Sequence, residues 1–200
     1  GDDSPRELVL PVPGEHMALN ALAALIAVRD YGGDVSEALE ALTHFGGVNR
    51  RFQYHGHVGG IRVYDDYAHH PTEARAVLTA AREVADADAQ GLGHPGRVIV
   101  CFQPHLFSRT EQFAEEFAKA LDLADYAIVL DIYGAREKPI PGVTSELITT
   151  QLTIPHKYQP DFSKVPYDVA AIAEPGDIVL TMGAGNVTME ADAVIALLKG

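Results

Sequence analysis

The feature that most constrains the fold is the regular alternation, after residue 60, of short apolar runs with helical segments. Each apolar run has the length and composition of a buried strand, and each helical segment repeats its apolar residues at helical spacing. A chain that returns to its next strand through a helix builds a parallel sheet with helices on both faces. The sequence therefore predicts an α/β fold with a Rossmann-like, mostly parallel sheet. The expected strand–helix pairs are 61–65 with 71–87, 97–102 with 111–123, 126–131 with 145–152, a short strand near Lys157 with 163–173, and 177–182 with 187–198.

The amino-terminal part follows a different pattern. We expect a short strand at residues 7–12, followed by two helices at 15–31 and 35–45. Gly32-Gly33 ends the first helix, because glycine readily adopts the left-handed conformation that closes a helix. This part is therefore predicted to be a short segment built mainly from a pair of helices.

A turn-rich, basic stretch around residue 50 separates the two parts. We place a domain boundary near Asn49, so that residues 1–48 and 49–200 form separate regions. Beyond it, residues 52–57 and 61–65 flank Gly59-Gly60, a pattern typical of a β-hairpin. The second region is thus expected to begin with a hairpin that leads into the parallel sheet.

Charge and composition narrow the classes of partner. The net charge of −13 repels polyanions over long range and argues against nucleic acid as a partner. A few arginines in a cleft can still bind a small anion, because salt screens charges beyond about 8 Å. Cys101 is the only cysteine, which excludes an internal disulfide and fits a reducing cytoplasm. We find no apolar run of roughly 20 residues and no signal-peptide pattern at Gly1–Ser4, and so expect a cytoplasmic protein without a membrane segment.

Polar residues concentrate in the loops that follow the predicted strands. Parallel sheets bind ligands just beyond the carboxyl ends of their strands. The loops at the opposite edge, 89–93 and 174–176, carry no comparable cluster. A functional site is therefore expected at the carboxyl edge, in the loops 65–71, 103–110, 133–138 and 183–186.

The first of these loops holds two carboxylates, Asp65 and Asp66, then Tyr67, His69 and His70. Such groups can hold ribose hydroxyls or a metal, bind an anion, or transfer a proton. Capping of the helix that begins at proline 71 is the structural alternative. Capping explains one aspartate but not two aspartates and two histidines together, so the pattern favours a functional role.

The loop that follows residues 98–102 contains His105 and Arg109. An arginine at this edge can clamp a carboxylate or phosphate through two hydrogen bonds. Its alternative is an ordinary surface ion pair with Glu111 or Glu115, which is common and weak. A single histidine is as often structural as catalytic, so His105 is left open between the two.

Three further features have two readings each. The glycines of Gly183-Ala184-Gly185 can cradle a phosphate, but a tight turn from strand to helix needs the same residues, and we favour the turn. Arg50-Arg51 can hold a polyphosphate or merely solvate a linker. His16 and Asn20 share one helix face and can contact a base edge or cap the helix.

Taken in order, six motifs of this chain resemble the C-terminal part of the Mur ligases, and the resemblance spans nearly the whole sequence. Within the family, the motifs are most similar to those of members that join L-alanine to UDP-N-acetylmuramate. The motifs are Pro13-Gly14-Glu15-His16 with Asn20-Ala21, Arg50-Arg51-Phe52-Gln53, Asp65-Asp66-Tyr67-Ala68-His69-His70-Pro71-Thr72-Glu73, Phe102-Gln103-Pro104-His105 with Ser108-Arg109-Thr110, Pro139-Ile140-Pro141-Gly142, and Gly183-Ala184-Gly185.

The resemblance implies an ADP-forming acid–amino-acid ligase of peptidoglycan precursor synthesis. In that family the muramyl carboxylate is activated as an acyl phosphate, which the amine of the amino acid attacks. Residues 1–48 are similar to the end of the central ATP-binding domain, and residues 49–200 to the closing C-terminal domain. The chain has no GxxxxGK[ST] motif, so ATP and Mg²⁺ are expected to be bound mainly by missing N-terminal domains. The fragment alone is expected to be inactive.

Residue by residue, the resemblance implies a set of ligand contacts. Asn20 is expected to contact adenine, Arg51 the terminal phosphates, and Asp66 the ribose. Tyr67, His69 and Arg109 are expected beside the incoming amino acid, with Arg109 binding its carboxylate. Arg51 and His69 are the expected catalytic residues, and no residue of this chain is expected to ligate a metal.

The chain departs from the family pattern at two positions. Met17 stands where many relatives have asparagine, so one adenine contact is expected to be lost or replaced. Leu106 stands where some relatives have a second arginine, which leaves Arg109 to bind the carboxylate with less help. Arg136 or Lys138 can supply the missing positive charge.

Three other functions remain open at this point. The first is the family's ligase that recycles murein tripeptide, although Glu73 favours the L-alanine enzyme. The second is a metal-dependent hydrolase with Asp65, Asp66, His69, His70 and His105 as ligands. The third is a nucleotide-binding or regulatory domain without catalysis.

Overall fold

The structure is a computed structural model that describes residues 5–87 and 96–200. The chain divides into two compact units, Gly1–Val48 and Asn49–Gly200. Residues 89–93, which we expected to be a featureless loop, and Gly1–Ser4 lie outside the described residues. Each unit is described by itself.

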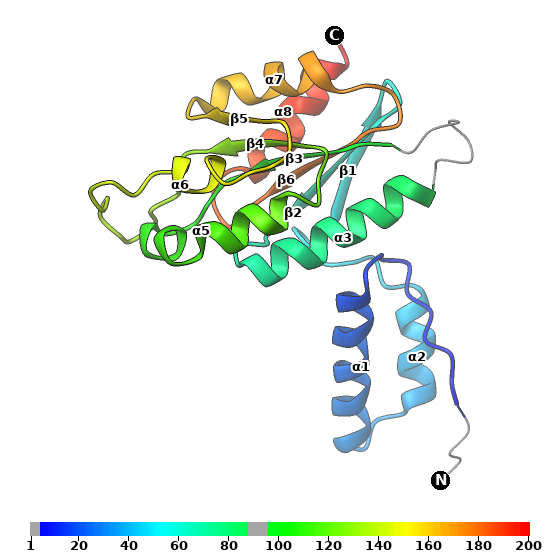
Figure 1. The fold of residues 1–200 in the computed structure, drawn as a ribbon. Helices are drawn as coiled ribbons and strands as arrows, with labels where there is room; N and C mark the ends of the chain where they lie inside the picture. The colour runs from blue at the N-terminus through cyan, green and yellow to red at the C-terminus, as the bar shows by residue number, and fades with distance from the viewer. Residues whose placement is uncertain (1–4, 88–95) are drawn as a thin grey trace. The chain divides into compact units, whose positions relative to one another are not determined.

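The first unit is a pair of helices, α1 at Glu15–Asp30 and α2 at Val35–Thr43 (Figure 1). The Asp34 carboxylate caps α2 by accepting hydrogen bonds from two backbone N–H groups of its first turn. The strand expected at residues 7–12 is wrong, because the segment is not a strand and pairs with no described strand. Pro11, inside the expected strand, carries no N–H group to donate to a neighbouring strand.

The second unit is built on a six-stranded sheet with the order β1-β2-β6-β3-β4-β5. Neighbouring strands are parallel, except that β1 runs antiparallel to β2. Gly59 and Gly60 join these two strands, and both have positive φ angles (58° and 84°), as the hairpin pattern predicted. The strands are β1 Gln53–Val58, β2 Ile61–Asp66, β3 Val98–Phe102, β4 Tyr126–Leu130, β5 His156–Gln159 and β6 Ile178–Met182.

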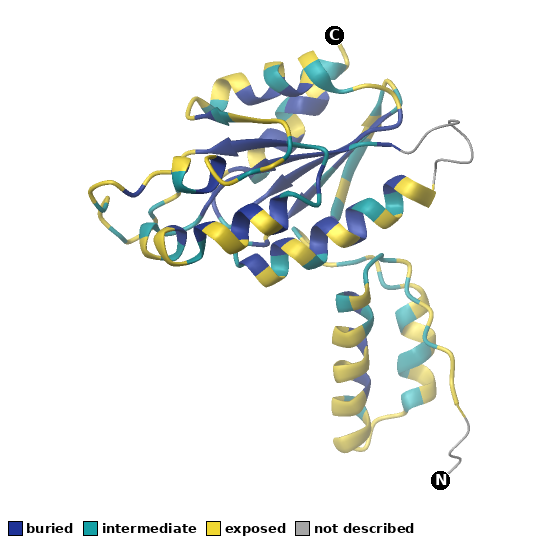
Figure 2. Cartoon of the chain, viewed as in Figure 1, coloured by how far each residue is buried: buried dark blue, intermediate teal, exposed yellow. Residues whose placement is uncertain are grey.

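Helices cover both faces of the sheet, as the alternating pattern predicted (Figure 1). Helices α3, α5 and α6 pack on one apolar core, whereas α7 and α8 pack on the other. The central strands β3 and β6, between these layers, are buried along their whole length (Figure 2). The helices are α3 Pro71–Ala87, α5 Phe107–Leu121, α6 Glu146–Thr149, α7 Val165–Ile172, which follows the 3₁₀ turn Phe162–Lys164, and α8 Thr188–Leu198.

Two predicted helix boundaries are wrong. Helix α5 begins at Phe107 and not at residue 111, so Arg109 lies in a helical turn instead of a free loop. Leu106 precedes the helix with φ +69° and makes no side-chain cap, so the usual capping signal is missing from the sequence. Helix α6 covers only Glu146–Thr149 instead of residues 145–152.

Among the described residues, no helix combines the length and the apolar character that crossing a membrane requires.

Candidate functional site

The carboxyl ends of β2, β6 and β3 lie side by side, because their last residues are in register. Asp66 pairs with Met182, which in turn pairs with Phe102. The next strand, β4, continues this edge beside β3. The four polar loops predicted from the sequence therefore begin at one edge of the sheet, where a single ligand can contact several of them.

Asp66 ends β2 and is almost completely buried, with 1% of its surface exposed. One carboxylate oxygen accepts a hydrogen bond from the N–H of Phe52 and the other from the N–H of Ala68, both at 2.7 Å. Burial raises the pKa of Asp66 to about 6, although both backbone N–H groups and the nearby Arg51 charge oppose the rise. In this structure Asp66 therefore joins the loop after β2 to the segment that precedes β1.

Tyr67 follows directly and is exposed. The guanidinium of Arg50 lies 4.7 Å from the centre of its ring, and that of Arg51 lies 5.7 Å away. Arg51 is itself exposed, whereas Arg50 is partly buried. Of the two adjacent arginines, Arg51 is thus the one that can reach a ligand.

His69 lies between this loop and the next. Its Nδ1 is 3.0 Å from the carbonyl oxygen of Tyr67 and 3.3 Å from the Glu73 carboxylate. The same carboxylate accepts hydrogen bonds from the N–H groups of His69 and His70 and so caps the start of α3. The ring of His69 makes edge contacts with Tyr67 and with His105. His69 is therefore held from several sides at the sheet edge.

Arg109 reaches the same place from the first turn of α5. Its guanidinium donates a hydrogen bond to the carbonyl oxygen of His69, at 3.2 Å. The surface ion pair with Glu111 or Glu115 that we considered from the sequence does not form among the described residues, and Glu115 pairs with Lys119 instead. Arg109 thus faces the loop after β2.

His105 adopts an intermediate exposure between His69 and Tyr133, and its ring stacks on that of Tyr133 at 5.8 Å. Its Nδ1 is buried and has no hydrogen-bond partner among the described atoms. Burial first, and then the charges of His69 and Arg109, lower the pKa of His105, which favours the neutral form of its ring. A row of four rings from three loops results: Tyr67, His69, His105 and Tyr133.

The glycines of the loop after β6 are required by close packing. A Cβ atom on Gly183 would lie 2.6 Å from the Gln103 carbonyl oxygen, and one on Gly185 would lie 2.2 Å from the Gln103 amide oxygen. Gln103 is buried and also bonds the Asn186 side chain and the N–H of Val187. Close packing of this loop explains both glycines, and so does the tight turn that we favoured from the sequence.

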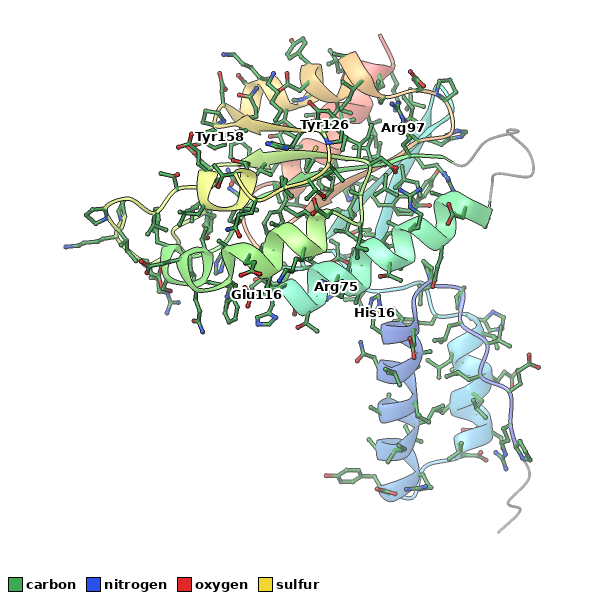
Figure 3. The ribbon with its side chains drawn as sticks, viewed as in Figure 1. His16, Arg75, Arg97, Glu116, Tyr126 and Tyr158 are labelled. Atoms are coloured by element: carbon green, nitrogen blue, oxygen red, sulfur yellow. The ribbon has the colours of Figure 1, made fainter. Side chains whose placement is uncertain are left out.

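The remaining predicted residues lie elsewhere. Asn20 is exposed on α1, and His16 lies at the start of the same helix (Figure 3). Both belong to the first unit, so their contact with a nucleotide at the sheet edge stays a prediction. Arg136 and Lys138 are exposed in the loop after β4.

Sequence reasoning missed three structural roles at this edge. Gln103 joins β3 to the glycine loop, and Glu137 accepts hydrogen bonds from the N–H and hydroxyl of Ser108 at the start of α5. Arg50 donates hydrogen bonds to the Asp65 carboxylate and to the Gly183 carbonyl oxygen, inside the second unit. Only Gln103 carried a signal, because a polar residue directly after a buried strand has to find a partner.

The histidines and aspartates of the edge do not gather around one point. Within residues 5–87 and 96–200, no group of three or more histidine, cysteine, aspartate or glutamate side chains is placed to hold a metal ion. Asp65 and Asp66 accept hydrogen bonds from other groups of the protein. The five ligands of the hydrolase alternative therefore do not form a site here.

Fold and edge together define the class: an α/β domain whose candidate ligand site lies at the carboxyl ends of parallel strands. The chain belongs to the Mur ligase family, since the family model "Mur ligase, glutamate ligase domain" matches residues 50–185.

Three relatives show how the likeness is distributed. The UDP-N-acetylmuramate–L-alanine ligases of Rhodococcus opacus and Rhodococcus jostii are 55% and 56% identical over 100% of this chain, which covers 41% of each. The crystal structure of UDP-N-acetylmuramate–alanine ligase from Thermotoga maritima matches 96% of the chain, with a TM-score of 0.76 and 31% identity, over 40% of its own length. This chain therefore spans about two fifths of the length of the relatives it matches.

Proposed function

We propose that this chain is the closing part of an ATP-dependent ligase that joins L-alanine to UDP-N-acetylmuramate in peptidoglycan precursor synthesis. The high identity to ligases of that name, over the full length of this chain, supports the choice of substrates. Residues 1–48 are the end of the central ATP-binding domain, and residues 49–200 are the C-terminal domain. The enzyme works in the cytoplasm, a reducing compartment that suits a chain with a single cysteine.

The observation that carries the proposal is the convergence of Tyr67, His69 and Arg109 on one rim. Arg109 donates to the backbone of His69, and the ring of His69 touches that of Tyr67. Arg51 lies beside the same tyrosine. Two exposed or half-exposed arginines thus flank one polar surface, which suits substrates that carry a carboxylate and a polyphosphate.

Each side chain has a distinct task in the proposed reaction. The muramyl carboxylate attacks the terminal phosphorus of ATP, ADP leaves, and the amine of L-alanine then displaces phosphate from the acyl phosphate. Arg51 stabilises the charge on the transferring phosphoryl group, and Arg109 holds the carboxylate of L-alanine. Tyr67 and His69 line the space for the amino acid, and His69 is placed to handle a proton near its amine.

The nucleotide contacts require more than the second unit. Asn20 contacts adenine and Asp66 accepts hydrogen bonds from the ribose hydroxyls. Asp66 is buried and already accepts hydrogen bonds from the N–H groups of Phe52 and Ala68, so ribose binding needs a local movement of the loop after β2. Mg²⁺, bound mainly by the N-terminal domains, neutralises phosphate charge when present.

The decisive experiment joins this chain to the N-terminal domains of the enzyme and measures ADP release. We expect release that depends on both L-alanine and UDP-N-acetylmuramate, and none from the 200-residue chain alone. L-alanine and murein tripeptide should be compared as acceptors, because preference for the tripeptide would move the chain to the recycling branch of the family. ATP binding without ligation by the full-length protein would instead support a regulatory domain.

The role of Arg109 has its own test. We expect Arg109→Ala to raise the KM for L-alanine about 100-fold, because loss of a charge-assisted pair removes about 2–3 kcal/mol of binding. Arg75→Ala removes an exposed arginine of α3 and serves as the control (Figure 3). An unchanged KM and kcat in Arg109→Ala would remove Arg109 from the substrate site.

A further inference from the structure

We propose that Arg50 is a positioning residue that fixes the exposed Arg51 by tying the chain before β1 to the loops after β2 and β6. The proposal rests on the function proposed above for Arg51. The sequence analysis gave Arg51 a phosphate contact and gave Arg50 no role of its own, and the surroundings of the two arginines in the second unit differ.

The Arg50 guanidinium is committed to partners within the protein. Its Nε donates to the Asp65 carboxylate at 3.2 Å, and its Nη2 donates to the carbonyl oxygens of Gly183 and Gly185. One face also covers the ring of Tyr67. Three of these partners belong to two different strand-end loops, so one side chain joins them. A guanidinium with this set of contacts is not available to bind a phosphate.

The buried Asp65 carboxylate holds the Arg50 guanidinium in this position. Its side chain is fully buried, and it accepts hydrogen bonds from the hydroxyls of Thr181 and Thr188, both at 2.7 Å. Arg50 is the cation that pairs with it among the described residues. A buried carboxylate without its partner charge is costly, so the pair holds Arg50 in place.

The backbone on either side of Arg51 is anchored in an uncommon conformation. Arg50 has φ +59° and Phe52 has φ +46°, a region that residues other than glycine seldom adopt. The Arg50 N–H donates to the Gln53 side chain and its carbonyl accepts from Tyr67, both within 2.8 Å. The Phe52 N–H donates to Asp66. Arg51 thus projects from a segment that is fixed before and after it.

A double-mutant cycle in the full-length enzyme tests whether Arg50 acts through Arg51. We expect Arg51→Ala to lower kcat/KM for ATP about 100-fold or more, as loss of a charge-stabilising donor does, and Arg50→Ala to lower it about 10-fold or more. The double variant should lie within about 3-fold of Arg51→Ala, because a misplaced group that is already absent cannot be lost again. Arg75→Ala is the matched control and should keep the wild-type value.

A conservative variant guards against misfolding. Arg50→Lys keeps the charge opposite Asp65, but one ammonium cannot span a carboxylate and two carbonyls as the planar guanidinium does. We expect Arg50→Lys to fold, and to lower kcat/KM for ATP only when Arg51 is present. Losses that multiply in the double variant, or an Arg50→Ala enzyme with unaltered kcat/KM and only a lower Tm, would overturn the proposal.

Amide hydrogen exchange separates this inference from the proposed function. We expect Arg50→Ala to speed exchange at Phe52 and Tyr67 about 10-fold or more, and Arg51→Ala to leave both unchanged. Unchanged exchange in Arg50→Ala overturns the positioning role whether or not the enzyme is a ligase. A wild-type enzyme without ligase activity but with this exchange pattern refutes only the proposed reaction.

Discussion

The hydrogen bonds and pKa values of single residues at the sheet edge depend on burial as much as on charge. The sequence indicates that Asp66 binds ribose hydroxyls, and yet both its carboxylate oxygens accept hydrogen bonds from backbone N–H groups in the folded chain. Burial likewise lowers the pKa of His105, whose ring is packed between His69 and Tyr133. The polar character of these residues predicted the location of the site, and their packing shifts their pKa values.

The raised pKa of Asp66 has a consequence for stability. Folding favours its protonated form, so the stability that Asp66 contributes is present below about pH 4 and is lost as the pH rises through about 6. The loss is about 3 kcal/mol at most, which is the free energy equivalent of a pKa raised from 3.8 to about 6. A carbon-13 titration of the Asp66 carboxyl, assigned with Asp66→Asn, should give a midpoint near pH 6. A midpoint near the ordinary 3.8 would contradict the burial argument.

At the scale of elements, helix starts shape the site. Helix α3 begins at Pro71, as predicted, because proline at the first helical position and Glu73 two residues later give a clear local signal. Helix α5 begins earlier than predicted. Its start was missed because it follows Leu106, whose φ of +69° is a conformation that leucine rarely adopts. Glu137, from a different loop, supplies the missing acceptor for the start of α5.

The Glu73 cap also holds His69, and its removal can be measured. We expect Glu73→Ala to lower the free energy of unfolding by about 1 kcal/mol, the usual value of a helix cap. Glu83→Ala, an exposed position on the same helix, should change it by less than about 0.5 kcal/mol. Urea unfolding of both variants measures the two changes. Equal changes in the free energy of unfolding would show that the hydrogen bonds to His69 and His70 do not stabilise the fold.

At the scale of the whole molecule, the two units differ in how much core each one contains. The second unit buries two apolar layers on either side of its sheet. Among the described residues of the first unit, the buried apolar side chains are Met17, Ala21 and Leu25 of α1, while Leu19 and Leu22 of the same helix are exposed. A segment of this size has too small a core to be stable without further packing.

Hydrogen exchange in the 200-residue chain should reveal this difference. We expect amides in α1 and α2 to exchange about 100-fold faster, or more, than amides in β3 and β6, because small cores open at low cost in free energy. Mass spectrometry of peptides from each unit makes the comparison within one sample. Equal protection of the two units would show that the first is stabilised by more than its own core.

The sequence by itself determined the order of strands and helices, the hairpin at Gly59-Gly60 and the edge on which polar residues gather. These follow from local patterns, since apolar spacing, proline and glycine act over a few residues. The tertiary structure alone decided that Arg50 is bound and Arg51 is exposed, because the partners of Arg50 lie as far as 135 residues away. It also buried Asp66 and brought Arg109 to His69, contacts that exist only after the strands have aligned.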